Sequence, residues 1–275
     1  MEKIKGFVIK YPIIFGFILF VLYAVLGALT FPIHYIFPDT EIGKLYADTV
    51  AKCVMFGIFL LLLRGFGWVR TSGLTRRGAP GIWVIVVIIF IYKVSLELFA
   101  FTGKFAFMVT GKELSFAKLI YYLPASLVEE TIFRALLLIA MLYAWGSTRK
   151  GIIKAVLLSS CFFGFFHLFN LLENPSLVVV YQAVIVSLPG IIYSALLLKG
   201  RSLWPAIMIH WLTNAAVNIK IAENPDFQET FSMWLIYGLI LIPPVAYSFY
   251  SIRKLPETYI SDYFNVSGSL KEQEQ

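Results

Sequence analysis

Residues 119–145 read LIYYLPASLVEETIFRALLLIAMLYAW, and this stretch decides which fold class the chain can adopt. It is apolar over a membrane-spanning length except for Glu129, Glu130 and Arg134 near its middle. A run of about 20 apolar residues is long enough to cross a bilayer as a helix. An ionisable group inside such a run is costly and usually faces the protein interior or a wet cavity. The stretch therefore predicts a membrane-spanning helix that carries a functional polar site.

The composition of the whole chain also indicates a membrane protein. Of its 275 residues, 59% are hydrophobic and 14% are charged, whereas soluble domains carry about 25% charged residues. The apolar runs are continuous rather than alternating with period two, which argues against a transmembrane barrel. We expect an all-α, polytopic integral membrane protein with about eight transmembrane helices. Besides 119–145, the expected spans are 11–32, 46–63, 82–101, 151–171, 177–198, 203–221 and 231–252.

The loop charges predict how the chain is oriented. Basic residues gather at both ends and in alternate loops, so the positive-inside rule places both termini in the cytoplasm. The net charge of +7 is not concentrated in a basic block, and we expect no nucleic-acid partner. The short loops favour a multi-pass protein of a prokaryotic plasma membrane, in contact with the lipid bilayer.

The domain organisation follows from the same loops. We expect residues 1–275 to form a single transmembrane domain, with a catalytic core at 119–221 and a polar, frayed C-terminal tail at 256–275. The loop at 101–118 mixes aromatic residues with lysines. It is either an amphipathic segment at the membrane surface or a plain loop.

Polar side chains that are unusual inside a membrane concentrate in three of the expected spans. Glu130 and Arg134 are four residues apart and can pair on one helix face. Glu129 points about 100° away and is left free to face a cavity. The alternative is a buried ion-pair network that only joins helices. The other polar residues inside these spans are His167, His210, Asn214 and Asn218.

Charges elsewhere in the spans are expected to be few. Lys93 and Glu97 lie four residues apart in 82–101 and are expected to form an ion pair on the helix surface. The interiors of the remaining spans are expected to be free of charge. The histidines and carboxylates of the three polar spans are therefore the candidates for chemistry.

These residue types favour hydrolysis by an activated water. A carboxylate and an imidazole can together take a proton from water. A second imidazole with an amide can donate hydrogen bonds to the oxyanion of a tetrahedral intermediate. No GxSxG or HExxH motif is present. The set Glu129, His167 and His210 could instead bind Zn²⁺, and the sequence leaves both mechanisms open.

Three motifs in order resemble the CAAX-protease and bacteriocin-processing family (CPBP, or Abi), which includes the Ras-converting CAAX prenyl endopeptidases. They are a Glu-Glu-x-x-x-Arg motif at 129–134, a Phe-x-x-x-His motif at 163–167 and a His-x-x-x-Asn motif at 210–214. The resemblance extends over about a third of the chain, from 119 to 221. It implies an eight-helix intramembrane endopeptidase.

The resemblance also implies a role for each matching residue. Glu129 and His167 would activate the water, and His210 and Asn214 would form the oxyanion hole. Supporting roles fall to Glu130 and Arg134. No cofactor would be required, with zinc as the alternative. The substrate would be a peptide or protein, either prenylated or embedded in the membrane.

Two functions from other classes compete with the protease. One is a non-catalytic protein that binds a peptide or a bacteriocin and confers immunity. The other is a transporter whose intramembrane Glu and His side chains relay protons. Transporters often carry inverted repeats, and no repeat is detectable here. The intramembrane endopeptidase is therefore the leading hypothesis.

Overall fold

The computed structural model describes residues 1–102, 112–172, 175–222, 231–256 and 258–266. Helices account for nearly all of this part of the chain, which contains no strand. Of the expected 101–118 loop, residues 103–111 lie outside the described residues and 112–118 belong to α5. The helices are α1 (Glu2–Lys10), α2 (Pro12–Thr30), η1 (Phe31–Ile36), α3 (Glu41–Gly65), α4 (Pro80–Thr102), α5 (Lys112–Glu130), η2 (Thr131–Leu138), α6 (Ile139–Trp145), α7 (Arg149–Phe166), η3 (His167–Leu172), α8 (Leu177–Gly200), α9 (Trp204–Ala222), α10 (Phe231–Arg253) and α11 (Tyr259–Val266).

All eight expected apolar segments are helical, which confirms an all-α membrane protein. Among the described residues, five helical segments are long and apolar enough to cross a membrane, and a sixth, shorter apolar helix covers Pro80–Leu96. The five are Pro12–Ile36, Glu41–Gly65, Arg149–Leu172, Leu177–Gly200 and Phe231–Arg253. Large apolar side chains are exposed on their outer faces, as expected where lipid replaces water: examples are Phe17, Val21, Leu61, Val184 and Leu239.

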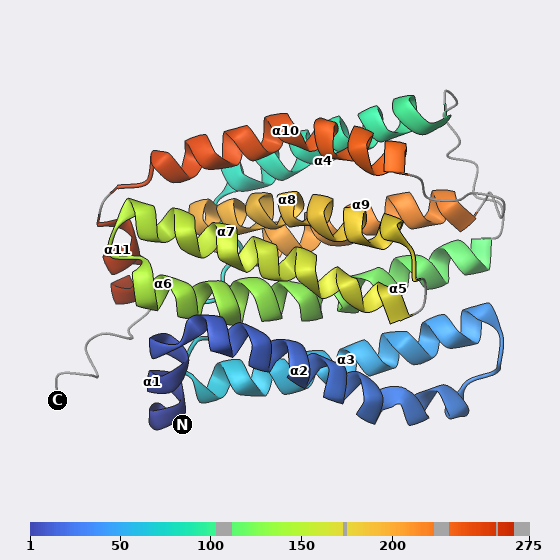
Figure 1. Ribbon diagram of the computed structural model, residues 1–275, viewed down its shortest axis with the longest axis horizontal. Helices are drawn as coiled ribbons and strands as arrows, with labels where there is room; N and C mark the ends of the chain where they lie inside the picture. Colours follow the sequence, from blue (N-terminus) through green and yellow to red (C-terminus); the bar gives the residue numbers. More distant parts are fainter. Residues whose placement is uncertain (103–111, 173–174, 223–230, 257, 267–275) are drawn as a thin grey trace.

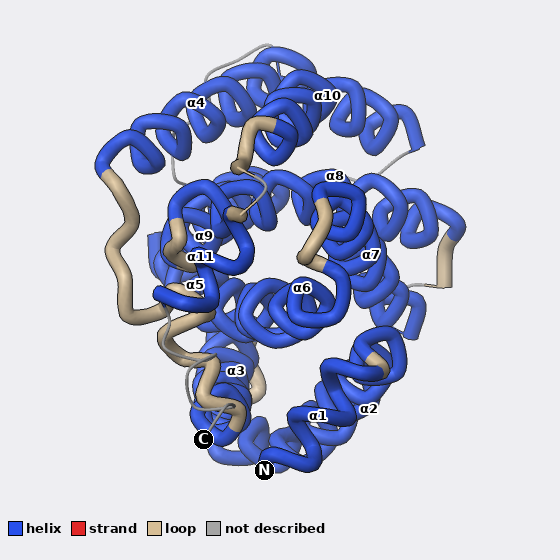
Figure 2. The backbone as a smooth tube through the Cα atoms, turned by 90° about the vertical axis from the view of Figure 1, so that its left-hand side faces the viewer, coloured by secondary structure: helices blue, strands red, loops and turns tan. Residues whose placement is uncertain are grey.

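The helices are arranged in three layers along one common direction. Helices α2 and α3 form one outer layer, and α4 and α10 form the other (Figure 1). Between them lies a middle layer of α5 with η2 and α6, α7, α8 and α9, visible end-on in Figure 2. The most extensive contacts join α7 to α8, α8 to α10, α3 to α5 and α5 to α9. The residues of the three motifs all lie in the middle layer, whereas Lys93 and Glu97 lie in α4.

The helix at the centre of the bundle changes its winding where the charges lie. After Glu130 the α-helix continues as a π-helical segment, η2, before it becomes α6. Every residue of η2 is buried, including Arg134. Wider π-helical turns are rare and are frequently found at functional sites. The winding therefore changes at the first of the three motifs.

The N-terminus and α11, the last described helix, lie at the same end of the bundle (Figure 1). The loop after α3, the end of α8 and the segment after α10 also meet there. Ser202 donates to the backbone carbonyl of Arg76, and Arg149 donates to the carbonyl of Leu255. Basic loops thus gather at this end. That it faces the cytoplasm stays a prediction from the positive-inside rule.

The expectation of a frayed C-terminal tail is wrong for residues 259–266, which form α11. Tyr263 is completely buried, and its hydroxyl donates to the carbonyl of Thr71 at 2.6 Å. Tyr259 donates in the same way to the carbonyl of Leu198. The Arg201 guanidinium packs 5.0 Å and 5.7 Å from the centroids of the two tyrosine rings. Aromatic rings with satisfied hydroxyls therefore fix a segment that looks polar in sequence.

Replacing Tyr263 with Phe should destabilise the fold, because it leaves the buried Thr71 carbonyl without its donor. Burial raises the pKa of the Tyr263 phenol, so the hydroxyl keeps its proton at neutral pH. The loss of the bond should cost about 1–2 kcal/mol, or roughly 2–8 °C in melting temperature in detergent. Tyr35→Phe is the control, because Tyr35 is 81% exposed. Equal melting temperatures for the two variants would contradict this account of α11.

Candidate active site

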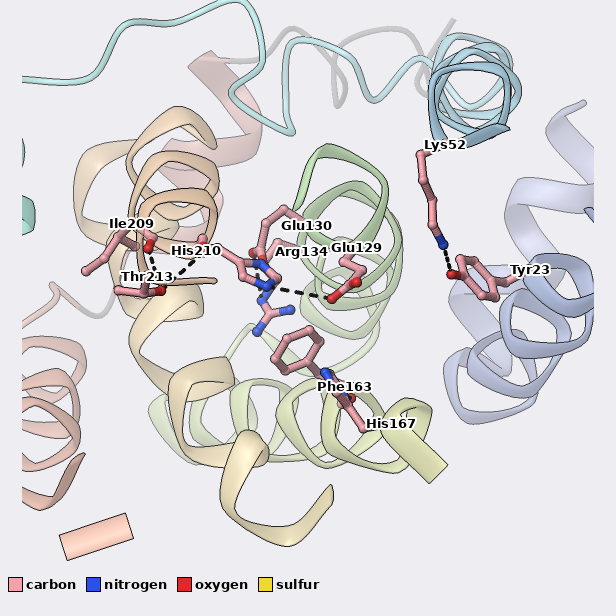
Figure 3. Close-up of polar contacts among 10 residues, drawn as sticks. All are labelled: Tyr23, Lys52, Glu129, Glu130, Arg134, Phe163, His167, Ile209, His210 and Thr213. Atoms are coloured by element: carbon pink, nitrogen blue, oxygen red, sulfur yellow. Dashed lines mark hydrogen bonds and ion pairs between the residues drawn. The ribbon is translucent and has the colours of Figure 1, made fainter. Parts of the chain in front are cut away.

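A chain of three buried side chains connects η2 to α9. His210 Nδ1 donates to Glu130 Oε1 at 2.8 Å, and Arg134 Nε lies 3.2 Å from Glu130 Oε2 (Figure 3). Glu130 and Arg134 are completely buried, and His210 is 3% exposed. The pair expected four residues apart on the helix is therefore present. In addition, Glu130 fixes the orientation of the histidine on the neighbouring helix.

Aromatic faces surround the Arg134 guanidinium. Its central carbon lies 4.3 Å from the centroid of the Phe163 ring and 5.3 Å from that of Tyr193. None of its nitrogens makes an aligned hydrogen bond to a described protein group. Cation–π contacts with desolvated rings compensate part of the free energy lost when the guanidinium is buried without aligned hydrogen bonds. Gly190 leaves room for the guanidinium, because a Cβ at this position would lie 3.0 Å from Arg134 Nη2.

The same two rings also hold His210. The ring of Tyr193 stacks on the imidazole with a centroid separation of 5.1 Å and an interplanar angle of 21°. Phe163 meets it edge-on at 5.6 Å and 89°. Sequence reasoning missed this role of Tyr193. It is one of two tyrosines in the apolar 177–198 span, and no signal in the sequence distinguishes it from Tyr181.

Glu129 lies beside this chain of contacts. Its Oε2 is 3.7 Å from His210 Nε2, and its side chain is 16% exposed. Oε2 has no hydrogen-bond partner among the described protein groups. A carboxylate oxygen of this kind can accept a proton from a reacting molecule. The two adjacent carboxylates thus differ as their sequence spacing predicts. Glu130 is paired with Arg134, whereas Glu129 has an oxygen that can accept a proton.

His167 lies where α7 ends and η3 begins. Thr148 caps the start of α7, where its hydroxyl accepts from the backbone N–H of Gly151 at 3.0 Å. At the other end, His167 Nδ1 donates to the carbonyl of Phe163 at 2.9 Å. A carbonyl can only accept, so Nδ1 carries the proton. In the neutral ring, Nε2 is then free to accept a proton.

The imidazole of His167 shares the electrostatic environment of the other site residues. It interacts electrostatically with Glu129, His210 and Arg134. Its ring also contacts Phe163 edge-on, with a centroid separation of 5.1 Å. Phe163 therefore links the second and third motifs through ring contacts.

The amide of the third motif occupies the neighbouring turn of α9. Asn214 is half-buried and lies four residues after His210, so both belong to one helix face. The side chain of Asn218, expected on the same face, lies outside the described residues. The three motifs thus come from η2 with the end of α5, from α7 with η3, and from α9.

The zinc alternative requires a ligand set that the described residues do not form. No three His, Cys, Asp or Glu side chains in the described part of the chain are grouped so that they could hold a metal ion. These residues do not fit a zinc site, and we derive no step through a metal.

Two expectations about charges in the other spans are wrong. Lys93 does not lie on the helix surface, because it is 5% exposed and its Nζ lies 4.8 Å from the centroid of the Tyr237 ring. The side chain of Glu97 lies outside the described residues. The interior of the 46–63 span also carries a charge, Lys52, which donates to the Tyr23 hydroxyl (Figure 3). A lysine inside an apolar run was the signal that could have identified it.

The fold and the site define a polytopic helical membrane protein with a buried Glu–His polar site at the centre of its bundle. Residues 111–216, less than half of the chain, match the family model of the type II CAAX prenyl endopeptidase Rce1-like proteins. The matched segment contains all three motifs, in agreement with their resemblance to the CAAX-protease family. At family level the match supports a CAAX-protease-like membrane peptidase. No curated protein and no solved structure matches the chain.

Proposed function

We propose that this chain is an intramembrane endopeptidase in which Glu129 and His167 activate a water molecule and His210 and Asn214 stabilise the oxyanion. The observation that carries the proposal is the different engagement of the two carboxylates. Glu130 is hydrogen-bonded to His210, whereas Glu129 Oε2 lies 3.7 Å from His210 Nε2 and has no hydrogen-bond partner among the described protein groups. A base and an oriented imidazole therefore stand side by side in a buried site.

The water would be activated between the first two motifs. The Glu129 carboxylate accepts a proton from water, and His167 Nε2 accepts its other hydrogen in a hydrogen bond. The water oxygen forms a bond to the carbonyl carbon of the peptide. The proton on Glu129 then passes to the amide nitrogen, and the C–N bond breaks to give a carboxylic acid and an amine. Low dielectric around the site strengthens each of these interactions.

The geometry around His210 sets a condition for the oxyanion hole. Its Nδ1 donates to Glu130, so it can donate to an oxyanion only if Nε2 is protonated as well. In this proposal His210 acts as an imidazolium, held between Glu129 and Glu130, when the tetrahedral intermediate forms. The Asn214 amide supplies the second donor. One lost donor of this kind typically lowers kcat by about 10²–10³-fold.

The substrate we propose is a peptide or a membrane-embedded protein, prenylated or not. The cleavage products test this proposal. The full chain is reconstituted in liposomes and incubated with a mixture of proteome-derived peptides, and new termini are identified by mass spectrometry. We expect termini that are absent from empty liposomes and from liposomes with the Glu129→Gln variant. If all three samples show the same termini, a peptide-binding or proton-coupled transport function becomes the better explanation.

A further inference from the structure

Lys52 is a cation close to the middle of a membrane-spanning helix. It lies eleven residues after Glu41, the first residue of α3, and therefore about 16 Å along the helix axis. Its side chain is half-buried. Because charges at this depth are costly, they usually mark a substrate or ion pathway. The three motifs of the proposed function do not include this residue.

The direct contacts of Lys52 are with a tyrosine. Its ammonium donates to the Tyr23 hydroxyl on α2 and lies 4.5 Å from the centroid of the same ring. Within the described residues it forms no ion pair with a carboxylate. Asp48, one turn earlier on α3, is bonded to His34 Nε2 at 2.9 Å. A carboxylate of a ligand could therefore pair with Lys52 without displacing a carboxylate of the described residues.

The Tyr23–Lys52 pair adjoins the proposed active site. Tyr23 packs edge-on against Phe166, with a centroid separation of 4.4 Å, and Phe166 directly precedes His167. The Tyr23 hydroxyl also interacts electrostatically with Glu129. Glu129 lies between His210 on one side and the Tyr23–Lys52 pair on the other (Figure 3). A peptide that reaches Glu129 therefore comes close to the pair.

The pair has the donors that a carboxylate requires. After one N–H is used on Tyr23, the ammonium keeps two N–H donors. The phenol accepts one hydrogen bond and becomes a better donor through its own O–H. Ammonium and phenol together can hold both oxygens of one carboxylate in charge-assisted bonds. Without a cation here, the charge of Glu129 would repel such a group.

We propose that Lys52 and Tyr23 form a subsite that binds a carboxylate of the peptide substrate, next to the scissile bond. The carboxylate is either the free C-terminus or an Asp or Glu side chain. The subsite would then select peptides with such a group near the bond to be cut. This inference rests on the proposed peptidase function, although binding of a peptide can be measured without cleavage.

Three forms of one dansyl-labelled apolar hexapeptide test the subsite. The first form has a free C-terminal carboxylate, the second a C-terminal amide, and the third an amide with one Asp side chain. Binding is measured to the full-length Glu129→Gln variant in liposomes, and kcat/KM is measured with the unmodified chain. We expect one or both carboxylate forms to bind about 10–100-fold more tightly than the neutral form. The form that binds more tightly than the neutral peptide shows whether the carboxylate comes from the C-terminus or from a side chain.

Variants then locate the effect. Lys52→Met should abolish the preference for a carboxylate, Tyr23→Phe should weaken it because one of the two donors is lost, and Lys52→Arg should retain most of it. Lys118→Met is the matched control, because it removes a cation from α5 that lies 3.7 Å from Glu41. The Lys118→Met variant should keep the full preference for peptides with a carboxylate. Melting temperatures identify any variant that fails to fold. If Lys52→Met is one of them, Lys52→Gln replaces it as the variant without the cation.

Different results would overturn the two proposals. Equal binding of all three forms by the Glu129→Gln variant would overturn the subsite. An equal loss of kcat/KM for every form in Lys52→Met would also overturn it, because Lys52 would then only support Glu129. If the unmodified chain cleaves no peptide while a carboxylate preference that depends on Lys52 persists, the peptidase function fails and the subsite stands.

Discussion

Replacing Glu129 with Gln should lower kcat for peptide hydrolysis by about 10²–10⁴-fold, the usual contribution of a general base. The amide keeps the size of the side chain but cannot take a proton from water. The contacts of Glu130 with His210 and Arg134 should persist, because they do not involve Glu129. We therefore expect the melting temperature to stay close to that of the unmodified chain. Rates are measured in liposomes on a peptide that the unmodified chain cleaves.

Glu41→Gln is the matched control for this change. Glu41 lies at the start of α3 with a side chain that is 67% exposed, so the same substitution should leave kcat unchanged. If Glu129→Gln cleaves as fast as the control, another group is the base and the proposed mechanism is wrong. A variant that still binds peptides but no longer cleaves them separates a protease from a protein that only binds peptides.

Replacing Arg134 with Met should have the largest effect on stability. The change removes the charge that faces Glu130 and leaves this buried carboxylate without its arginine partner. Removing one partner of a buried ion pair costs about 3–5 kcal/mol. That corresponds to a decrease of roughly 6–20 °C in melting temperature, measured by thermal unfolding in detergent. Activity should fall as well, because Glu130 orients His210.

The double variant Glu130→Gln/Arg134→Met tests the cause of that loss. If the unpaired carboxylate is responsible, removing its charge should restore part of the lost stability. Arg70→Met is the control, because Arg70 is exposed in the loop after α3. No recovery in the double variant would mean that Arg134 stabilises the bundle by filling space between the rings. A melting temperature of Arg134→Met equal to that of Arg70→Met would contradict the account.

The sequence predicts the helical architecture well because membrane helices have a simple signal. Each apolar run of spanning length satisfies its own backbone hydrogen bonds, and all eight expected runs are helical. The pairing of Glu130 with Arg134 was also predictable, since residues four apart on a helix are neighbours. Both predictions depend only on local spacing.

Features that depend on contacts between distant residues could not be predicted in this way. The bond from Glu130 to His210 joins residues 80 positions apart, and no spacing rule relates them. The same is true of the hydrogen bond from Tyr263 to Thr71. This bond helps to hold α11 in place, although its sequence looks like a polar tail. Lys52 was missed for a different reason. It is one cation in a long apolar run, and its importance becomes visible only beside Tyr23 and Glu129.

The most direct test of the central claim is an experimental structure of the full chain with a bound phosphinic peptide, which mimics the tetrahedral intermediate. We expect one phosphinyl oxygen, in the place of the attacking water, about 3 Å from both the Glu129 carboxylate and His167 Nε2. The other oxygen should accept hydrogen bonds from His210 Nε2 and the Asn214 amide. A peptide bound elsewhere, or Glu129 and His167 facing separate environments, would contradict the claim that these motifs form one hydrolytic site.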